Sequence, residues 1–140
     1  MTTIEIKKAE ADFSFEATDI KDHLVKFDTS DETGGTSFGV RPMHSILMSL
    51  GACSGIDIVS ILKKQRLTVK DFTMRISGER ESGKEPSLWA SAHIDFELTG
   101  EIETEKAERA CALSMNKYCS VAETLRRGGT KITWNVRVNN

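Results

Sequence analysis

The fold is decided by residues 42–64, which read PMHSILMSLGACSGIDIVSILKK. Pro42 suits the first turn of a helix, because the N–H group that proline lacks would have no helical partner there. Apolar residues then cover nearly every face until two lysines end the pattern at Lys64, and a helix that is apolar all round is typical of the middle of a fold. Gly51 and Gly55 lower the helix propensity but allow another backbone to approach closely.

Short strands are expected before this helix. Apolar and polar residues alternate around residues 4–7, 13–15 and 24–27, with a polar turn at 18–22. Residues 28–39 contain many turn-forming residues and no apolar period, so we expect a loop there, of the kind that often borders a functional site.

Further strands and helices are expected after it. Strands are predicted at about 69–76, 88–98 and 132–138, and a helix from about Thr104. In the strand at 88–98, one face should consist of Leu88, Ala90, Ala92, Ile94, Phe96 and Leu98, and Trp89 should lie on the other face with the polar residues. These elements predict a single α+β domain over residues 1–140, with antiparallel sheets around a long central helix.

Composition excludes several classes of function. The 140 residues are 39% hydrophobic and 29% charged, with a net charge of −2, so a basic nucleic-acid-binding surface is not expected. The apolar run at 42–64 is interrupted by serines, glycines and Asp57, which favours a buried helix over a membrane span. Without a signal-peptide pattern, and with only three cysteines, the chain is expected to be a cytoplasmic protein whose cysteines are reactive or simply buried.

Cys119 is the most informative cysteine. The pattern Ser-Val-Ala-Glu at 120–123 resembles a capping box, which predicts a short helix with Ser120 as its N-cap, ending at the two glycines 128–129. Unpaired N–H groups and the positive end of the helix dipole gather at such a position, so the pKa of Cys119 should fall and its thiolate should form more easily. The alternative is that Cys119 fills a gap beside the cap.

The other two cysteines lie within helices. Cys53 sits between small residues in the middle of the helix at 42–64, on the same face as Asp57. Because an apolar environment raises the pKa of a thiol, activation of Cys53 needs a cation or a hydrogen bond from elsewhere. Cys111 is interpreted as structural.

Histidines offer little support for a metal site. His44 lies on roughly the opposite face of its helix from Cys53, and His23 and His93 are expected at the surface. No paired C-x-x-C motif, H-x-x-x-H motif or glycine-rich phosphate loop occurs, so no metal and no bound cofactor are predicted.

Two cysteine segments resemble those of one known family. Residues 42–64 are similar to the first cysteine helix of the OsmC/Ohr family, and LSMNKYCSVAETL at 113–125 resembles its second cysteine segment. The separation of the cysteines, the Gly-Gly pair at 34–35 and the final strand agree as well, so the resemblance covers essentially the whole chain.

This resemblance implies an OsmC-like fold and an intertwined homodimer, with the long helix at its centre and active sites at the subunit interface. It also implies a thiol-dependent peroxidase that reduces organic hydroperoxides or a similar small apolar electrophile. Cys53 would attack the peroxide and become a sulfenic acid, and Cys119 would condense with it to a disulfide. An external dithiol, of lipoyl type in the best-defined branch, would restore the pair.

The sequence departs from the peroxidase pattern at the activating residues. The glutamate that follows the proline in the peroxidases is replaced here, where Met43 and His44 follow Pro42, and no arginine occurs before Arg41. Arg41 and His44, the latter acting from the other subunit, are therefore candidate activating residues. Arg126 and Arg127 are further candidates, and the segment resembles the less-studied OsmC-like branches more than Ohr itself.

Two other interpretations stay open. One is a non-catalytic module of the same fold that binds a small molecule or senses thiol oxidation. The other is adventitious binding of zinc or copper by Cys53, Cys119 and His44.

Overall fold

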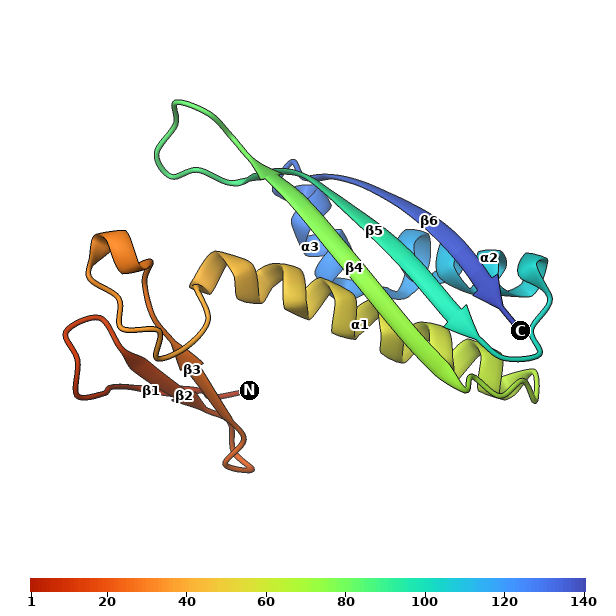
Figure 1. Ribbon diagram of the computed structural model, residues 1–140, viewed down its shortest axis with the longest axis horizontal. Coiled ribbons are helices and arrows are strands. Elements are labelled where there is room, and N and C mark those ends of the chain that lie inside the picture. Colours follow the sequence, from red (N-terminus) through yellow and green to blue (C-terminus); the bar gives the residue numbers. More distant parts are fainter. The chain divides into compact units, whose positions relative to one another are not determined.

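The computed structural model describes all 140 residues and divides into two compact units, residues 1–46 and 47–140 (Figure 1). The first unit contains a three-stranded antiparallel sheet in the order β1-β2-β3. Its strands are β1 (Glu5–Lys8), β2 (Phe15–Thr18) and β3 (Leu24–Phe27). All three occur close to the predicted places, although β2 begins at the second of the two phenylalanines that suggested it. That the two units form one domain stays a prediction.

The loop expected at 28–39 is organised by the buried Asp28. Its carboxylate accepts hydrogen bonds from the backbone N–H groups of Thr36 (2.9 Å), Phe38 (3.1 Å) and Thr29 (2.7 Å). These bonds, that from Thr36 foremost, lower the pKa of Asp28 below its usual value. The short 3₁₀ helix η1 (Asp31–Thr33) ends at Gly34, whose φ of +113° favours glycine. The hydrogen bonds to the Asp28 carboxylate therefore hold the loop in one conformation.

The helix α1 (Pro42–Lys64) has the bounds that the sequence predicts. In the second unit its buried stripe consists of Leu50, Gly51, Ser54, Gly55, Ile58 and Leu62. A Cβ atom on Gly51 would come within 2.8 Å of the Ile76 side chain, and one on Gly55 within 2.8 Å of the Met74 side chain. A close approach at these glycines is therefore present, but side chains of the neighbouring strand make it, not the backbone that the sequence predicted.

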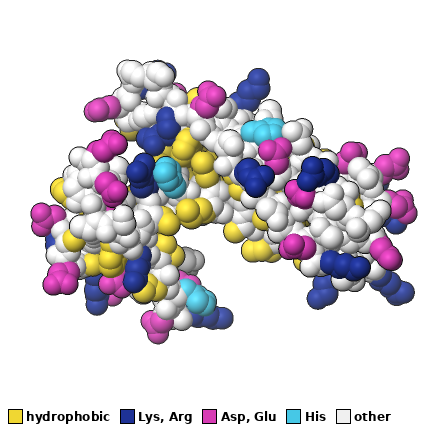
Figure 2. Space-filling view, in the orientation of Figure 1, with side chains coloured by type: hydrophobic (Ala, Val, Ile, Leu, Met, Phe, Trp, Pro, Cys, Tyr) yellow, Lys and Arg dark blue, Asp and Glu magenta, His cyan; other side chains and the backbone are white.

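The sequence predicts that α1 is buried on nearly every face, but in the single chain one part of its apolar surface is exposed. Met48, Ile56 and Val59 are exposed, and Figure 2 shows hydrophobic side chains at the surface along this helix. The helix is long and apolar enough to cross a membrane by length and composition alone. Its buried stripe instead packs in the core of the second unit, which indicates a soluble protein.

The second sheet has the order β4-β5-β6. The strands β4 (Asp71–Arg80) and β5 (Trp89–Thr99) form an antiparallel pair, as predicted. The strand β6 (Lys131–Asn139) pairs with β5 in parallel, so the expectation of purely antiparallel pairing is wrong for this pair. The reason is the connection: the helical segment after β5 carries the chain back before β6 begins, which is the form of connection that a parallel pair requires.

That connection consists of three helical segments. They are α2 (Thr104–Leu113), the π-helical turn η2 (Ser114–Tyr118) and α3 (Ser120–Arg127). Both predicted helices are present, and Gly128 caps the end of α3. Residues of α1, α2, η2 and α3 share one hydrophobic core with the central strand β5, and the sheet crosses in front of these helices in Figure 1. The largest fully buried apolar side chains there are Phe96, Leu50, Ile58, Leu62, Ile94, Leu98 and Met115.

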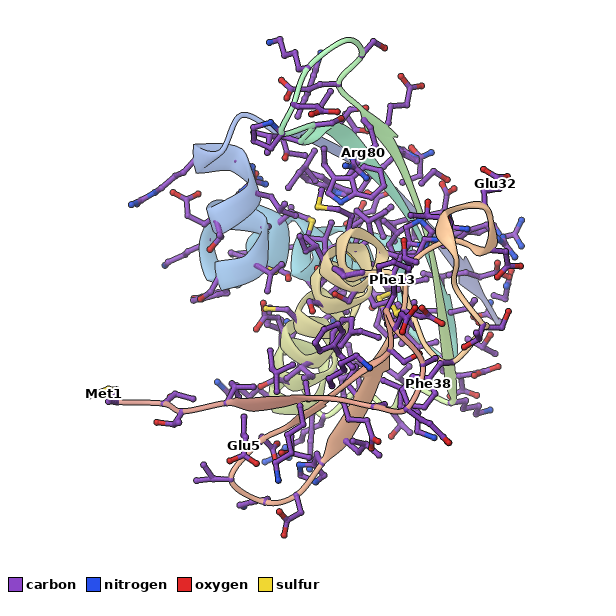
Figure 3. All side chains as sticks on the ribbon, turned by 90° about the vertical axis from the view of Figure 1, so that its left-hand side faces the viewer. Met1, Glu5, Phe13, Glu32, Phe38 and Arg80 are labelled. Atoms are coloured by element: carbon purple, nitrogen blue, oxygen red, sulfur yellow. The ribbon has the colours of Figure 1, made fainter.

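The strand β5 follows the predicted alternation only after its first residues. Ala92, Ile94, Phe96 and Leu98 are buried as expected. Trp89, predicted on the polar face, is buried instead, while Ala90 is exposed. The cause is an irregularity in the pairing beside Arg80, where one extra residue of β5 reverses the faces. The Arg80 guanidinium, labelled in Figure 3, lies 5.3 Å from the centre of the Trp89 ring.

Candidate functional site

The structure brings Cys53 and Cys119 together in the second unit. Cys53 lies in the middle of α1, and Cys119 is the N-cap of α3. Both sulfur atoms and a carboxylate oxygen of Asp57 lie within 4.8 Å of one another. Both thiols are free, and a disulfide between them needs the sulfurs to approach to about 2.0 Å. The two residues are therefore neighbours in the reduced protein and need only a local movement to bond.

Cys119, rather than Ser120, caps α3. The Cys119 sulfur accepts a hydrogen bond from the Ala122 N–H group at 3.4 Å, and this satisfies one of the free donors at the helix start. The predicted capping box is absent, because the N-cap is Cys119 and Glu123 then lies one position too late in the helix. The Glu123 side chain pairs with Arg127 at 3.0 Å. The inference that a cysteine sits at the positive end of this helix is thus strengthened, although the cap residue differs by one position.

The predicted fall in the pKa of Cys119 is wrong. Cys119 is only 3% exposed, and this burial raises the pKa of its thiol. The hydrogen bond from Ala122 acts in the opposite direction, as does the contact with Ser54, while the neighbouring Cys53 raises the pKa further. Removal of the thiolate from water therefore outweighs the hydrogen bond at the helix N-terminus.

Ser54 connects α1 to the Cys119 thiol. Its hydroxyl is fully buried, donates to the Leu50 carbonyl at 2.6 Å and lies 3.7 Å from the Cys119 sulfur. Because Ser54 follows Cys53 directly, the same turn of α1 carries Cys53 and contacts Cys119.

Asp57 is the site residue whose importance sequence reasoning missed. It follows Cys53 by four residues, which places both side chains on one face of α1. Its Oδ2 atom accepts a hydrogen bond of 3.0 Å from the Ser114 hydroxyl, which comes from the π-helical turn η2. The available signal was a single acidic residue one turn after a cysteine in an otherwise apolar helix. Its partner Ser114 could not be inferred from spacing.

A groove adjoins this cluster. It has a volume of about 510 Å³ and is lined by Asp57, Ser60, Ile61, Lys64, Gln65, Leu113 and Tyr118. Tyr118 is half-exposed and directly precedes Cys119. The groove therefore offers a route from solvent to the side of the cysteine pair.

The remaining predicted residues are not members of the cluster of Cys53, Asp57 and Cys119. Arg41 and His44 belong to the first unit and are exposed, and their role at the thiols stays a prediction. Arg126 and Arg127 both pair with Glu123 on α3. Cys111 is fully buried in the core, where burial and then the nearby Glu108 raise the pKa of its thiol to about 12, as suits a structural cysteine.

His23 and His93 have ordinary polar neighbours. His23 is exposed and bonds to Asp19 at 2.8 Å. His93 lies on the partly exposed face of β5, 2.7 Å from the Thr133 hydroxyl. Neither residue belongs to the cluster of Cys53, Asp57 and Cys119.

Comparison with known proteins gives one family. The sequence model of the family described as OsmC-like protein matches residues 33–135, which include both Cys53 and Cys119. Protein YhfA of Escherichia coli K12 is 40% identical over 87 residues, which cover 61% of this chain and 64% of YhfA. The match therefore spans slightly less than two thirds of that relative.

Solved structures show the same fold over the full length. A hypothetical protein from Aquifex aeolicus VF5 superposes with a TM-score of 0.82 and 28% identity, covering 100% of this chain and 98% of the other. An organic hydroperoxide resistance protein OsmC from Legionella pneumophila superposes with a TM-score of 0.73, covering 98% and 96% of the two chains. Identity in the second case is 15%, so that likeness concerns the fold alone.

Proposed function

Since the chain belongs to the OsmC-like protein family, we propose that it reduces organic hydroperoxides through Cys53 and Cys119. The observation that carries this proposal is the position of the two sulfurs, within 4.8 Å of each other and without a bond between them. A sulfenic acid formed at one of them would have a thiol within reach, which protects it from further oxidation. Cys111, fully buried in the core, offers no comparable partner.

The proposed reaction has two chemical steps on the protein. The Cys53 thiolate attacks one peroxide oxygen, the O–O bond breaks, and the alkoxide leaves as an alcohol after it takes up a proton. Cys53 is then a sulfenic acid. The Cys119 thiolate attacks its sulfur, hydroxide leaves and is protonated to water, and the Cys53–Cys119 disulfide forms. An external dithiol supplies two electrons and two protons to restore both thiols, so no bound cofactor is needed.

Cys53 suits the first step because it is the more accessible of the pair. It is half-buried, whereas Cys119 is nearly inaccessible. The Ala122 N–H group lies against the Cys119 sulfur, where it would stabilise the thiolate as it forms. The Ser54 hydroxyl would do the same by turning its hydrogen from the Leu50 carbonyl to the sulfur. We further propose that Arg41 or His44 supplies the positive charge that lowers the pKa of the attacking thiol during catalysis.

The proposed active form is a cytoplasmic homodimer. Met48, Ile56 and Val59 are 54%, 72% and 41% exposed, an apolar surface that a single chain leaves uncovered. A second copy packed along α1 would bury this surface and remove it from water. Such an arrangement would also give the substrate an apolar environment close to Cys53.

Rapid mixing of the reduced protein with cumene hydroperoxide tests the proposal. We expect the thiols to be oxidised at least about 100-fold faster than free cysteine, because a positioned thiolate gains both activation and orientation. The Cys111→Ala variant should react at the same rate. Oxidation no faster than that of free cysteine would overturn the peroxidase assignment.

A thiol sensor or binding module of the same fold is the second candidate. It is favoured by the burial of Cys119, which raises the pKa of its thiol and makes the thiolate harder to form. Such a protein would react slowly, would not turn over with a dithiol, and would lose little function in Cys119→Ser. A small molecule retained through purification would favour the binding module over the sensor.

A further inference from the structure

Three groups that bind metal ions converge beside the α3 N-cap. The Cys53 and Cys119 sulfurs and one Asp57 oxygen lie within 4.8 Å of one another. Two of these ligands come from successive turns of α1, and the third comes from a different element, so the fold itself assembles the set. In a tetrahedral zinc site, metal–ligand distances of about 2.0–2.3 Å place the ligand atoms roughly 3.4–3.8 Å apart. A shift of about 1 Å would bring this cluster to that geometry.

The atoms around the cluster already orient two of its members. Ser114 donates to Oδ2 of Asp57 at 3.0 Å, which holds the carboxylate and leaves Oδ1 available. The Ala122 N–H group donates a hydrogen bond to the Cys119 sulfur, which holds the sulfur in place and favours its thiolate form. Such outer hydrogen bonds fix the direction of metal ligands and are themselves important for affinity.

The charge balance also favours a cation. All three groups, the two thiolates and the carboxylate, are negative when they act as ligands. Asp57 also lines the groove of about 510 Å³, so an ion can reach the cluster from solvent and a water molecule has room beside it. Two thiolates and one carboxylate form a ligand set suited to zinc.

We propose that Cys53, Cys119 and Asp57 of the reduced protein bind one Zn²⁺ ion, with a water molecule as the fourth ligand. Each thiol releases its proton to solvent as it coordinates the metal. The assignment replaces His44 of the sequence-based hypothesis by Asp57. Metal binding and disulfide formation exclude each other because they use the same two sulfurs. The site itself does not depend on the proposed peroxidase activity.

Cobalt uptake provides the test, since Co²⁺ is coloured and occupies zinc sites. The reduced protein, without a histidine tag, is titrated with Co²⁺ under nitrogen, and Zn²⁺ is then added as competitor. We expect one Co²⁺ per chain, with a thiolate-to-cobalt absorption band that Zn²⁺ abolishes. Cys53→Ser and Cys119→Ser should each abolish that uptake. Asp57→Asn and Ser114→Ala should each weaken binding by about 10-fold or more, as loss of a ligand or of its orienting hydrogen bond predicts.

Two matched variants control the titration. Cys111→Ala, which removes the buried cysteine outside the cluster, and His93→Ala, which removes a histidine outside it, should bind with unchanged affinity. Thermal melting of each variant without metal shows whether it is folded. Absence of uptake, equal affinity in Asp57→Asn, or loss of binding in Cys111→Ala or His93→Ala would each overturn the proposal. Because no peroxide is present, these results are independent of the peroxidase test.

Discussion

Cys111 and Cys119 lie eight residues apart and are both buried, yet their surroundings differ in kind. Cys111 lies on the inner face of α2, is fully buried, and has a pKa raised to about 12. Cys119 caps α3, where a backbone N–H group, a serine hydroxyl and a second thiol surround its sulfur. Burial raises the pKa of both thiols, so burial alone does not distinguish them. The polar partners of Cys119 are what separate the cysteine that we propose to be reactive from the structural one.

The largest expected effect is on peroxide turnover, which should depend on Cys53 and not on Cys111. Cys53→Ser should lower turnover of cumene hydroperoxide with a dithiol by at least about 1,000-fold, because it removes the attacking atom. Steady-state peroxide consumption measures this. Cys111→Ala should change the rate by less than about twofold. Equal losses in the two variants would erase the distinction between the cysteines.

Alkylation of the native protein compares the reactivity of Cys53 and Cys111 directly. At pH 8 iodoacetamide should label Cys53 first and Cys111 at least about 100-fold more slowly, because Cys111 is inaccessible and almost wholly protonated. Mass spectrometry of tryptic peptides after timed quenching gives the rates. Comparable labelling of the two residues would contradict the packing of α2 described above.

The free energy of unfolding should depend on Cys111 at high pH. The unfolded chain loses the Cys111 proton near pH 9, whereas the folded chain keeps it until about pH 12. Stability contributed by this group is complete below pH 9 and falls as the pH rises toward 12, by at most about 1.4 kcal/mol per pH unit. Urea unfolding of wild type and Cys111→Ala measures it. The difference in unfolding free energy between wild type and Cys111→Ala should change between pH 9 and pH 12. A difference that stays constant would contradict the raised pKa of Cys111.

The smallest effect concerns the hydroxyl beside Cys119. Ser54→Ala removes one polar contact and should raise the pKa of Cys119 further, slowing disulfide formation about fivefold, as loss of about 1 kcal/mol of hydrogen bonding predicts. Rapid-quench measurement of the disulfide gives the rate. The exposed Ser60→Ala on the same helix is the control. If both variants behave alike, Ser54 plays no part in the chemistry.

The local features of this fold were predictable from sequence. Pro42 and the two lysines at the end of α1 mark its bounds, because they act on the nearest turn. The small residues Gly51 and Gly55 likewise indicated a close approach before its partner was known. These signals are local, so one sequence suffices to read them.

What could not be predicted depends on contacts distant in sequence. The Ser114–Asp57 bond joins residues 57 positions apart. The raised pKa of Cys119 reflects the burial of its thiol in the folded chain, which outweighs the hydrogen bond at the local helix end. The burial of Trp89 follows from irregular pairing with β4. Proximity of Cys53 and Cys119 was expected only from the family resemblance, because they lie 66 positions apart in the sequence.

The central claim is that Cys53 and Cys119 react as a pair while Cys111 takes no part. Disulfide mapping after treatment of the reduced protein with one equivalent of cumene hydroperoxide tests it most directly. Remaining thiols are blocked at low pH, and the peptides are then identified by mass spectrometry. We predict one intramolecular disulfide, between Cys53 and Cys119, with Cys111 recovered as a blocked thiol. A disulfide that includes Cys111, or a sulfinic acid at Cys53 with Cys119 still free, would contradict the account.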